Sequence, residues 1–213
     1  VADVDATPDS REPNYSMIRN LAAECRMPLC YAGGVTTPEQ IERIVGLGVE
    51  KVAIGSAAVR NPALIEESAR RVGGQSVVAV MDVRKSGIFR KYEVHTHRGS
   101  RGGGVNPVDY ARQVESLGAG EVLLNNIDRD GEMKGYDLEL VAQVRQAVRL
   151  PMSVLGGAGS LSDISALISR FGIIGAAAGS LFVFKGKYRA VLINYPSIEE
   201  KDDLLRGSTA SAN

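Results

Sequence analysis

Tryptophan is absent from this 213-residue chain, and aromatic residues make up only 5% of it. The formal net charge is zero, so overall charge gives no support for a nucleic-acid partner or an anionic membrane surface. No apolar run reaches the roughly 18 residues that a membrane-spanning helix needs. The two cysteines, Cys25 and Cys30, match no metal-binding spacing and predict a reduced, cytoplasmic protein.

Glycine and apolar residues are plentiful by comparison. The chain is 44% hydrophobic and 23% charged, which is typical of a folded protein with a sizeable core. Its 24 glycines predict many tight turns or close backbone approaches. The length allows one large domain or two small ones.

Short β-branched runs alternate with helix-like stretches along the chain. We expect strands near 1–5, 28–32, 50–55, 75–82, 120–126, 152–155 and 173–178, and helices near 14–25, 37–47, 61–71, 106–117, 137–147 and 160–170. The strand segments are apolar on both faces, as in Val77-Val78-Ala79-Val80. This pattern predicts an α/β protein with a parallel sheet or barrel and crossover helices.

Residues 86–104 interrupt this alternation. The stretch RKYEVHTH predicts an extra hairpin strand, and RGSRGGGVNP predicts a mobile, glycine-rich loop. Because this insertion follows the carboxyl end of a strand, it is a candidate lid over a site. His95 and His97 lie in the hairpin, but a metal site needs at least a third ligand. We therefore expect a surface hairpin and no metal.

An internal repeat divides the chain into two halves. MPLCYAGGVTTPEQI (27–41) aligns with LPMSVLGGAGSLSDI (150–164), and AIGSA (53–57) aligns with AAGSL (177–181). Counting by this repeat, one βα unit of roughly forty residues should precede Val1. We expect one (β/α)8 TIM barrel of two half-barrels over residues 1–213, without its first βα unit. Such a barrel would have an open edge between its second and eighth strands.

Glycine pairs recur after strands in both halves. Gly33-Gly34 and Gly156-Gly157 precede helices, and Gly55-Ser56 and Gly179-Ser180 occupy equivalent places later in each half. Glycine lets backbone N–H groups approach an anion, and the following helix N-terminus adds partial positive charge. A single such pair is more often only a tight turn. Four pairs in repeat register predict two phosphate sites, and therefore a ligand with a phosphate at each end.

Carboxylates gather at the same strand ends. Asp82 closes the apolar run 77–81 and should point over the barrel mouth, and the sequence DRDG (128–131) follows the next strand. Carboxylates at this rim can act as general acid or base. The alternatives are helix capping or pairing with Arg84 and Arg129.

Charged residues also begin strands at the opposite rim. Lys51 and Glu121 each stand just before apolar strand residues. Charges at such positions are usually solvated. The alternative is a salt-bridged layer that closes the bottom of the barrel.

Several stretches together resemble a known family. VVAVMDVRK, GAGEVLLNNIDRDGEMKGYDLEL, VLGGAG and AAAGSLF are similar to the cyclase subunit of imidazole glycerol phosphate synthase, a duplicated half-barrel of histidine biosynthesis. The resemblance runs from Val1 to about Phe184. It implies a lyase-type enzyme that needs no cofactor and takes ammonia from a glutaminase partner at the barrel bottom. The ammonia would convert a bis-phosphorylated imidazolecarboxamide into imidazole glycerol phosphate and an aminoimidazole carboxamide ribotide.

The resemblance also implies roles by position. Asp82 matches one of two catalytic aspartates, and the strand for the other would precede Val1. The remaining roles are one phosphate site at Gly34 and Ser56, a second at Gly131, Gly157 and Ser180, substrate contact at Asp130, and an ammonia gate at Lys51 and Glu121.

The sequence departs from this family in three places. Asn125-Asn126 replaces a typical Thr-Ser, and Ala32 replaces a third glycine. Near the end, residues 190–193 read as extended, and 197–213 read as a tail in place of an amphipathic last helix.

These departures resemble a paralogous branch associated with surface-polysaccharide genes. There the ammonia would support formation of an acetamidino group on a nucleotide sugar for lipopolysaccharide, which is the alternative function. A bis-phosphate barrel isomerase is a third candidate, and the NNIDRDG loop argues against it.

Overall fold

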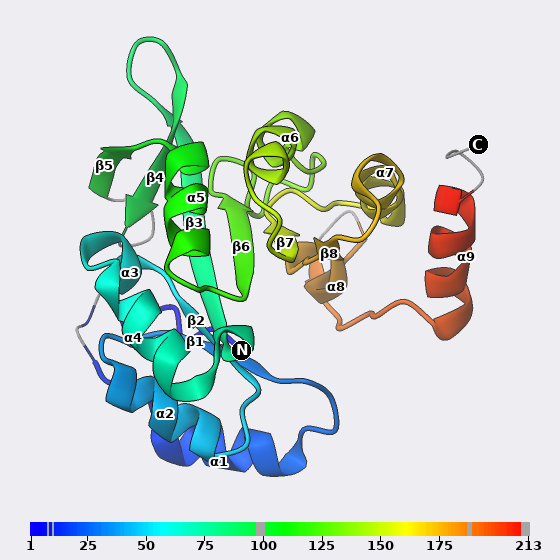
Figure 1. Ribbon diagram of the computed structural model, residues 1–213. Coiled ribbons are helices and arrows are strands. Elements are labelled where there is room, and N and C mark those ends of the chain that lie inside the picture. Colours follow the sequence, from blue (N-terminus) through cyan, green and yellow to red (C-terminus); the bar gives the residue numbers. More distant parts are fainter. Residues whose placement is uncertain (8, 10, 97–100, 187–188, 210–213) are drawn as a thin grey trace.

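The structure, a computed structural model, describes residues 1–7, 9, 11–96, 101–186 and 189–209. In this part of the chain, six parallel strands form one curled sheet in the order β1-β2-β3-β6-β7-β8 (Figure 1). Their bounds are β1 (Cys30–Ala32), β2 (Lys51–Ile54), β3 (Val77–Ser86), β6 (Glu121–Asn126), β7 (Met152–Leu155) and β8 (Gly175–Ala176). The predicted parallel sheet is confirmed.

Helices alternate with these strands, also as predicted. They are α1 (Tyr15–Glu24), α2 (Pro38–Gly46), α3 (Ser56–Arg60), α4 (Ala63–Val72), α5 (Pro107–Ser116), α6 (Leu138–Ala147), α7 (Leu161–Phe171) and α8 (Ser180–Val183), with a 3-10 turn at Gly74–Ser76. The expected helix over 61–71 is preceded by the short α3, because Pro62 separates α3 from α4. No helix in the described ranges combines the length and the apolar character that a membrane crossing requires.

Side-chain caps determine where the two repeat-related helices begin. Thr37 and Gln40 form a capping box at α2, and Ser160 and Asp163 form one at α7. Each box satisfies backbone N–H groups that have no partner inside the helix. In both halves, the glycine pair is therefore followed by a helix that begins with a capping box.

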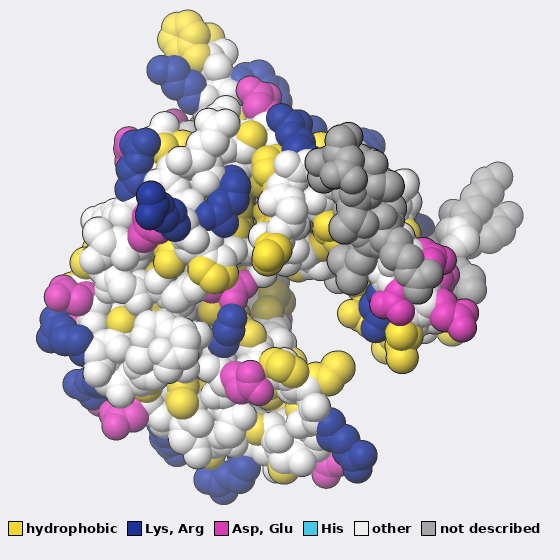
Figure 2. Space-filling view, turned by 45° about the vertical axis from the view of Figure 1, so that its right-hand side comes forward, with side chains coloured by type: hydrophobic (Ala, Val, Ile, Leu, Met, Phe, Trp, Pro, Cys, Tyr) yellow, Lys and Arg dark blue, Asp and Glu magenta, His cyan; other side chains and the backbone are white. Residues whose placement is uncertain are grey.

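The sheet remains open at both edges, as expected. In the described ranges β8 pairs only with β7, and residues 1–7 contribute only an isolated bridge from Ala2 to Ala32. The strand expected over 1–5 is therefore wrong, because the Asp3 carboxylate accepts a hydrogen bond from the Ala6 N–H and the chain turns. The strand expected over 173–178 is limited to β8. Figure 2 shows the hollow between the body of the molecule and the C-terminal segment.

An antiparallel extension is built on the far half of β3. The strand continues to Ser86, pairs with β4 (Lys91–Thr96), and β4 pairs with β5 (Arg101–Val105). The glycine-rich stretch is therefore a strand over 101–105, not the loop we expected. The pairing of β4 with β5 contains a register shift between Val94 and His95. Residues 97–100 of the predicted hairpin and loop, including His97, lie outside the described residues.

The C-terminal segment differs from the expectation. β9 (Phe184–Lys185) and β10 (Ala190–Val191) form a small antiparallel pair, so the extended reading at 190–191 is confirmed. After it, α9 (Ile198–Thr209) is helical and lies against α7 (Figure 1). The Ser197 hydroxyl accepts from the Glu200 N–H, and the Glu200 carboxylate accepts from the Ser197 N–H. This capping box in the sequence SIEE was the helix signal that we overlooked.

The main core lies between the sheet and its helices. Met81 on β3 and Leu124 on β6 are fully buried there, together with Tyr110 and Val114 of α5. The alternate residues of β3, among them Val80 and Asp82, face the other side of the sheet, where they line a cavity. Strand β3 thus contributes to the core with one face and to the cavity with the other.

We predict that Met81→Ala lowers the free energy of unfolding by about 3 kcal/mol, because it leaves a cavity in a close-packed core. Urea unfolding followed by circular dichroism measures the change. Ile88→Ala is the matched control, since Ile88 is 95% exposed at the hairpin turn, and it should change stability by less than about 0.5 kcal/mol. Equal losses for the two variants would contradict this assignment of the core.

Candidate active site

Asp82 lies at the centre of the candidate site, at the point on β3 where two neighbouring strands flank it. In the sheet register it stands between Asn125 of β6 and His95 of β4. The Asn125 Nδ2 group donates a hydrogen bond of 2.9 Å to Asp82 Oδ1. The carboxyl group opens on a cavity of about 440 Å³ at the carboxyl ends of the strands. Asp130 lines the same cavity.

The surroundings of Asp82 favour its neutral form. Burial raises the pKa of the carboxyl group above its ordinary value of 3.8, because the ionised form loses hydration. The hydrogen bond from Asn125 acts against this shift, Asp130 raises the pKa further, and His95 lowers it. A carboxyl group with a raised pKa can exchange a proton nearer to neutral pH.

The two aspartates of the DRDG sequence have different roles. Asp128 pairs with Arg84 at 3.3 Å and accepts a hydrogen bond of 2.9 Å from the Lys85 N–H, so it fastens the loop to β3. Asp130 faces the cavity. The structural alternative that we considered at the sequence level therefore describes Asp128, while Asp130 remains available to a ligand.

Asn126 and Asp137 hold this loop from beneath. Asn126 Nδ2 donates to Asp137 Oδ2 at 2.8 Å, and the Tyr92 hydroxyl donates to the same oxygen at 2.8 Å. Asp137 also caps α6 through the Leu140 N–H. Burial and Asp137 together raise the pKa of the Tyr92 hydroxyl, which stays protonated as the donor. Sequence reasoning missed Tyr92 and Asp137. No pattern in the sequence indicates that these two residues contact each other.

The first glycine cluster consists of Gly33, Gly34, Gly55 and Ser56, and it surrounds a second, smaller cavity of about 190 Å³. Gly34 has φ +67°, and a Cβ there would lie 2.4 Å from the Arg11 carbonyl oxygen, so only glycine fits. The Gly34 N–H donates to Thr7 Oγ1 at 3.3 Å. This small cavity shares Gly33, Gly55 and Ser56 with the central one.

Three further residues line the small cavity and were missed by sequence reasoning: Thr7, Arg11 and Arg60. Two guanidinium groups beside a glycine-rich loop are suited to an anion such as phosphate. The position of Thr7 and Arg11 in the repeat counterpart of the DRDG loop was a signal that could have found them. Arg60 gave none, since it lies just before the expected helix at 61–71 and belongs to no repeated motif.

The second glycine cluster consists of Gly131, Gly157 and Ser180. Gly131 lies beside Ser180, because a Cβ on Gly131 would be 4.0 Å from Ser180 Oγ. The Gly157 carbonyl accepts a hydrogen bond of 2.7 Å from the Gly135 N–H, which connects it to the loop after β6. The structure therefore brings the residues predicted for the second phosphate to one rim, from the ends of β6, β7 and β8.

Lys51 and Glu121 meet at the amino ends of the strands. The Lys51 Nζ and Glu121 Oε2 atoms are 2.5 Å apart, although their strands are separated by β3. The Ser153 hydroxyl donates to Glu121 Oε1 at 2.6 Å. The Glu121 side chain is only 14% exposed. Of the two readings left open, the structure shows the ion pair, with Glu121 largely buried and the Lys51 side chain 41% exposed.

The histidine of the hairpin is not a surface residue. His95 is 8% exposed, whereas we expected a surface hairpin. Because His95 is the register partner of Asp82, its side chain lies on the same face of the sheet as Asp82. Within the described ranges, no group of three or more His, Cys, Asp and Glu side chains is arranged to hold a metal ion.

Alternating strands and helices around a cavity at the strands' carboxyl ends define a βα-barrel type of protein. The comparison with protein families is more specific. A family model described as "Histidine biosynthesis protein" matches residues 1–189, and the chain belongs to this family. The resemblance that the motifs predicted is confirmed.

Three relatives show the range of similarity. A Vibrio vulnificus protein, provisionally named subunit hisF3 of imidazole glycerol phosphate synthase, is 51% identical over 203 residues, covering 95% of this chain and 78% of the relative. A Pseudomonas aeruginosa protein, provisionally named subunit hisF2 of that synthase, is 46% identical over 200 residues, covering 94% and 79%. The synthase subunit HisF of Thermobifida fusca is 39% identical over 186 residues, covering 85% and 72%. The link to polysaccharide genes stays a prediction.

The raised pKa of Asp82 has a consequence for stability. Its folded-state pKa exceeds the unfolded value, so protonated Asp82 is compatible with the fold, and stability is lost as pH rises through the folded-state pKa. We predict that Asp82→Asn raises the free energy of unfolding at pH 7 and that the difference from wild type vanishes below pH 3.8. Urea unfolding at both pH values measures it.

Asp128→Asn is the control for this prediction. It removes a carboxylate that is paired with Arg84, so it should destabilise the protein at pH 7 by about 1 kcal/mol. If Asp82→Asn destabilises the protein at pH 7 as Asp128→Asn does, the Asp82 carboxylate is well compensated and our description of its environment is wrong.

Proposed function

We propose that this chain is the cyclase subunit of a glutamine-dependent imidazole glycerol phosphate synthase. The observation that carries the proposal is the buried Asp82 carboxyl group, which opens on a cavity that Gly33, Gly55 and Ser56 of the first glycine cluster also line. A ligand with a phosphate at each end would suit this arrangement, because each cluster combines glycines with a serine at the start of a helix, Ser56 of α3 and Ser180 of α8, at the carboxyl ends of the strands. The family and the names of the three relatives support the same function.

In this proposal the two clusters position the ends of the bis-phosphorylated substrate. Gly34 and Ser56, with Arg11 and Arg60, bind one phosphate, and Gly131, Gly157 and Ser180 bind the other. The reacting carbons then lie over the central cavity, beside Asp82 and Asp130. Fixing both ends of a long substrate lowers the entropic cost of reaching the transition state.

Asp82 acts as a general acid or base in the ring closure and cleavage that follow the attack of ammonia. Ammonia must arrive unprotonated, so it has to be shielded from water until it reacts. A route from the opposite rim past Lys51 and Glu121 would provide this shielding. A glutaminase docked at that rim is the partner that supplies the ammonia. The free thiols Cys25 and Cys30 agree with a cytoplasmic location.

A second candidate function is delivery of ammonia for the amidation of a nucleotide sugar. The observation that favours it is the hydrogen bond from Asn125 to Asp82, since it occupies a carboxylate oxygen that the reaction of the first proposal would use. In this alternative the same partner and the same route operate, but another protein uses the ammonia. Turnover of the bis-phosphorylated substrate distinguishes the two functions.

We predict that the full-length protein forms imidazole glycerol phosphate from the bis-phosphorylated imidazolecarboxamide when ammonium chloride replaces the partner. Asp82→Asn should lower kcat by about 10²- to 10⁴-fold, because a general acid or base is lost. Asp109→Asn is the control on α5, where the side chain is 74% exposed, and should leave kcat unchanged. Absence of wild-type turnover, with a glutaminase still bound, would favour ammonia delivery.

The Lys51–Glu121 pair gives a separate prediction. Glu121→Gln removes the charge opposite Lys51, so glutamine-dependent turnover should fall by about tenfold, equivalent to about 1.4 kcal/mol. Turnover with added ammonium should stay within about twofold, since ammonia then enters from the solvent at the other rim. Ser153→Ala is the control, because it removes a hydrogen bond to Glu121 and keeps both charges. Equal losses with glutamine and ammonium would contradict a role in the ammonia route.

A further inference from the structure

Asn125 holds the candidate catalytic group by only one end of its side-chain amide. Its Nδ2 group donates to Asp82 Oδ1 at 2.9 Å. Its carbonyl oxygen, Oδ1, is buried and receives no hydrogen bond from any residue in the part of the chain that the structure describes. A buried acceptor without a donor is energetically unfavourable. The present orientation of this amide is therefore favoured at one end and opposed at the other.

The neighbouring amide, that of Asn126, is satisfied at both ends. Its Nδ2 group donates to Asp137 Oδ2 at 2.8 Å, and its Oδ1 atom accepts from the Asp128 N–H at 3.0 Å. A reversed Asn126 amide would face oxygen with oxygen and N–H with N–H, so its orientation is fixed. Asn125 differs, because reversal breaks a single hydrogen bond, and that bond depends on what Asp82 presents.

Gly156, which follows β7, leaves room at the unpaired end of the Asn125 amide. A Cβ at this glycine would lie 2.9 Å from Asn125 Oδ1 and 2.5 Å from the Asn126 carbonyl oxygen. Two oxygen atoms thus border one small space that a larger residue at 156 would fill. The NH₂ group of a reversed Asn125 amide would bring N–H donors to this space, beside the Asn126 carbonyl oxygen.

The protonation state of Asp82 decides which end of the amide can face it. An ionised carboxylate only accepts hydrogen bonds, so it requires the Nδ2 group of Asn125. A protonated carboxyl group carries an O–H donor, which can bond to the amide oxygen. Burial raises the pKa of Asp82, and the hydrogen bond from Asn125 opposes this rise. The two forms of Asp82 therefore exchange nearer to neutral pH than those of an exposed aspartate.

We propose that Asn125 is a positioning residue for Asp82, and that its side-chain amide reverses when the carboxyl group takes up a proton. In the ionised state Nδ2 donates to the carboxylate. In the protonated state the Asp82 O–H donates to Asn125 Oδ1, and Nδ2 turns toward the space at Gly156. Only hydrogen bonds are exchanged, and the proton stays on Asp82.

The consequence for catalysis rests on the proposed role of Asp82 in turnover. A general acid or base passes through both protonation states in each catalytic cycle. An amide that bonds to either state keeps the carboxyl group pointed in the same direction throughout the cycle. A group that only donates would hold the ionised form alone.

Charged groups from three neighbouring elements also influence Asp82. They are Asp130 of the loop after β6 and Asp3 of the N-terminal segment, which line the same cavity, and His95, the register partner on β4. Burial and the Asn125 bond act more strongly on the pKa of Asp82 than Asp130, which raises it, or His95, which lowers it. These groups affect the pH at which Asp82 titrates, whereas the proposed reversal follows that titration wherever it falls.

The test uses NMR of the full-length protein labelled with ¹³C and ¹⁵N. A scalar coupling across the hydrogen bond connects Asn125 Nδ2 with Asp82 Cγ while that bond exists. As the pH falls through the titration midpoint of Asp82, this coupling should disappear, and the Asn125 Cγ signal should shift with the same midpoint. The coupling from Asn126 Nδ2 to Asp137 Cγ is the internal control and should persist. A persistent Asn125 coupling, or loss of both couplings together, overturns the inference.

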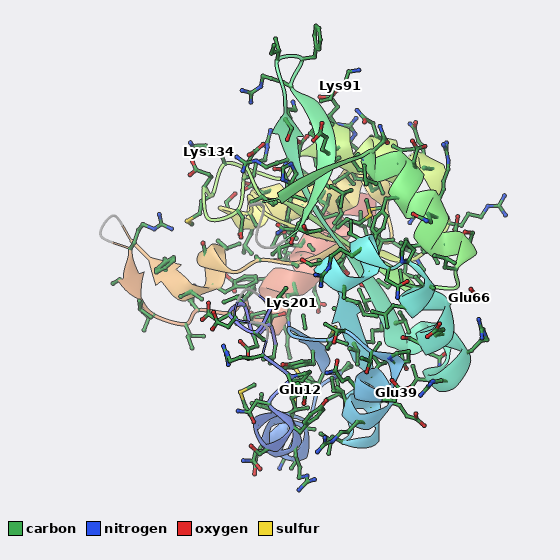
Figure 3. All side chains as sticks on the ribbon, turned by 90° about the vertical axis from the view of Figure 1, so that its left-hand side faces the viewer. Glu12, Glu39, Glu66, Lys91, Lys134 and Lys201 are labelled. Carbon is green, nitrogen blue, oxygen red and sulfur yellow. The ribbon has the colours of Figure 1, made fainter. Side chains whose placement is uncertain are left out.

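Asp82→Asn provides the same test at pH 7, without exposing the fold to acid. The introduced amide can donate, as the protonated carboxyl group does, so the coupling should now run from residue 82 to Asn125 Cγ. If Asn125 Nδ2 remains the donor, the inference fails. Lys134→Gln is the control, because Lys134 is on the same loop as Asp130 but is 75% exposed and pairs with Glu132 (Figure 3). It should keep the wild-type coupling at pH 7.

Turnover separates this inference from the proposed function. Asn125→Leu keeps the approximate size of the side chain and removes both hydrogen-bonding ends, so kcat should fall by roughly tenfold with KM within about twofold. An unchanged kcat would overturn the positioning role. If wild-type protein shows no turnover but the Asn125 coupling is lost on protonation of Asp82, the proposed function fails and the positioning role stands. If turnover is present and the coupling persists, the positioning role fails and the proposed function stands.

Discussion

The candidate site depends on the length of β3, which extends beyond the parallel strands on either side of it. Its first residues pair with β2, and its last residues, from Asp82 to Ser86, pair with β4 on the same edge. Along its other edge it pairs with β6 from Val78 to Val83. Asp82 is thus the residue at which the parallel ladder gives way to the antiparallel one. In the strand register, that junction places Asn125 on one side of Asp82 and His95 on the other.

The internal repeat made most of the site predictable from the sequence. Equal spacing placed the glycine pairs at equivalent strand ends, and strands of a parallel barrel have their carboxyl ends at one rim. The positions of Gly34, Ser56, Gly157 and Ser180 at one rim therefore followed from the pattern alone. The position of Asp82 over the mouth followed as well, because it ends an apolar run, whereas its burial came only from the structure.

Features that depend on contacts between distant residues could not be predicted. Glycine-rich stretches usually read as loops, and the pairing of this one with β4 depends on contacts that the sequence does not show. Asn125 and Asn126 stood out as departures, but nothing in the sequence showed that one contacts Asp82 and the other Asp137. Lys51 and Glu121 are 70 residues apart, so their ion pair required the curvature of the sheet.

The hydrogen bond from Tyr92 to Asp137 limits how the hairpin can move. Asp137 is 7% exposed and also holds Asn126 and the first turn of α6. Moving the base of the hairpin away from Asp137 would break this contact and leave a buried carboxylate with fewer partners, which is energetically unfavourable. The turn beyond it, with Ile88 and Phe89 exposed, has no such restraint in the described contacts. Movement of the hairpin relative to the sheet is therefore expected at its turn and not at its base.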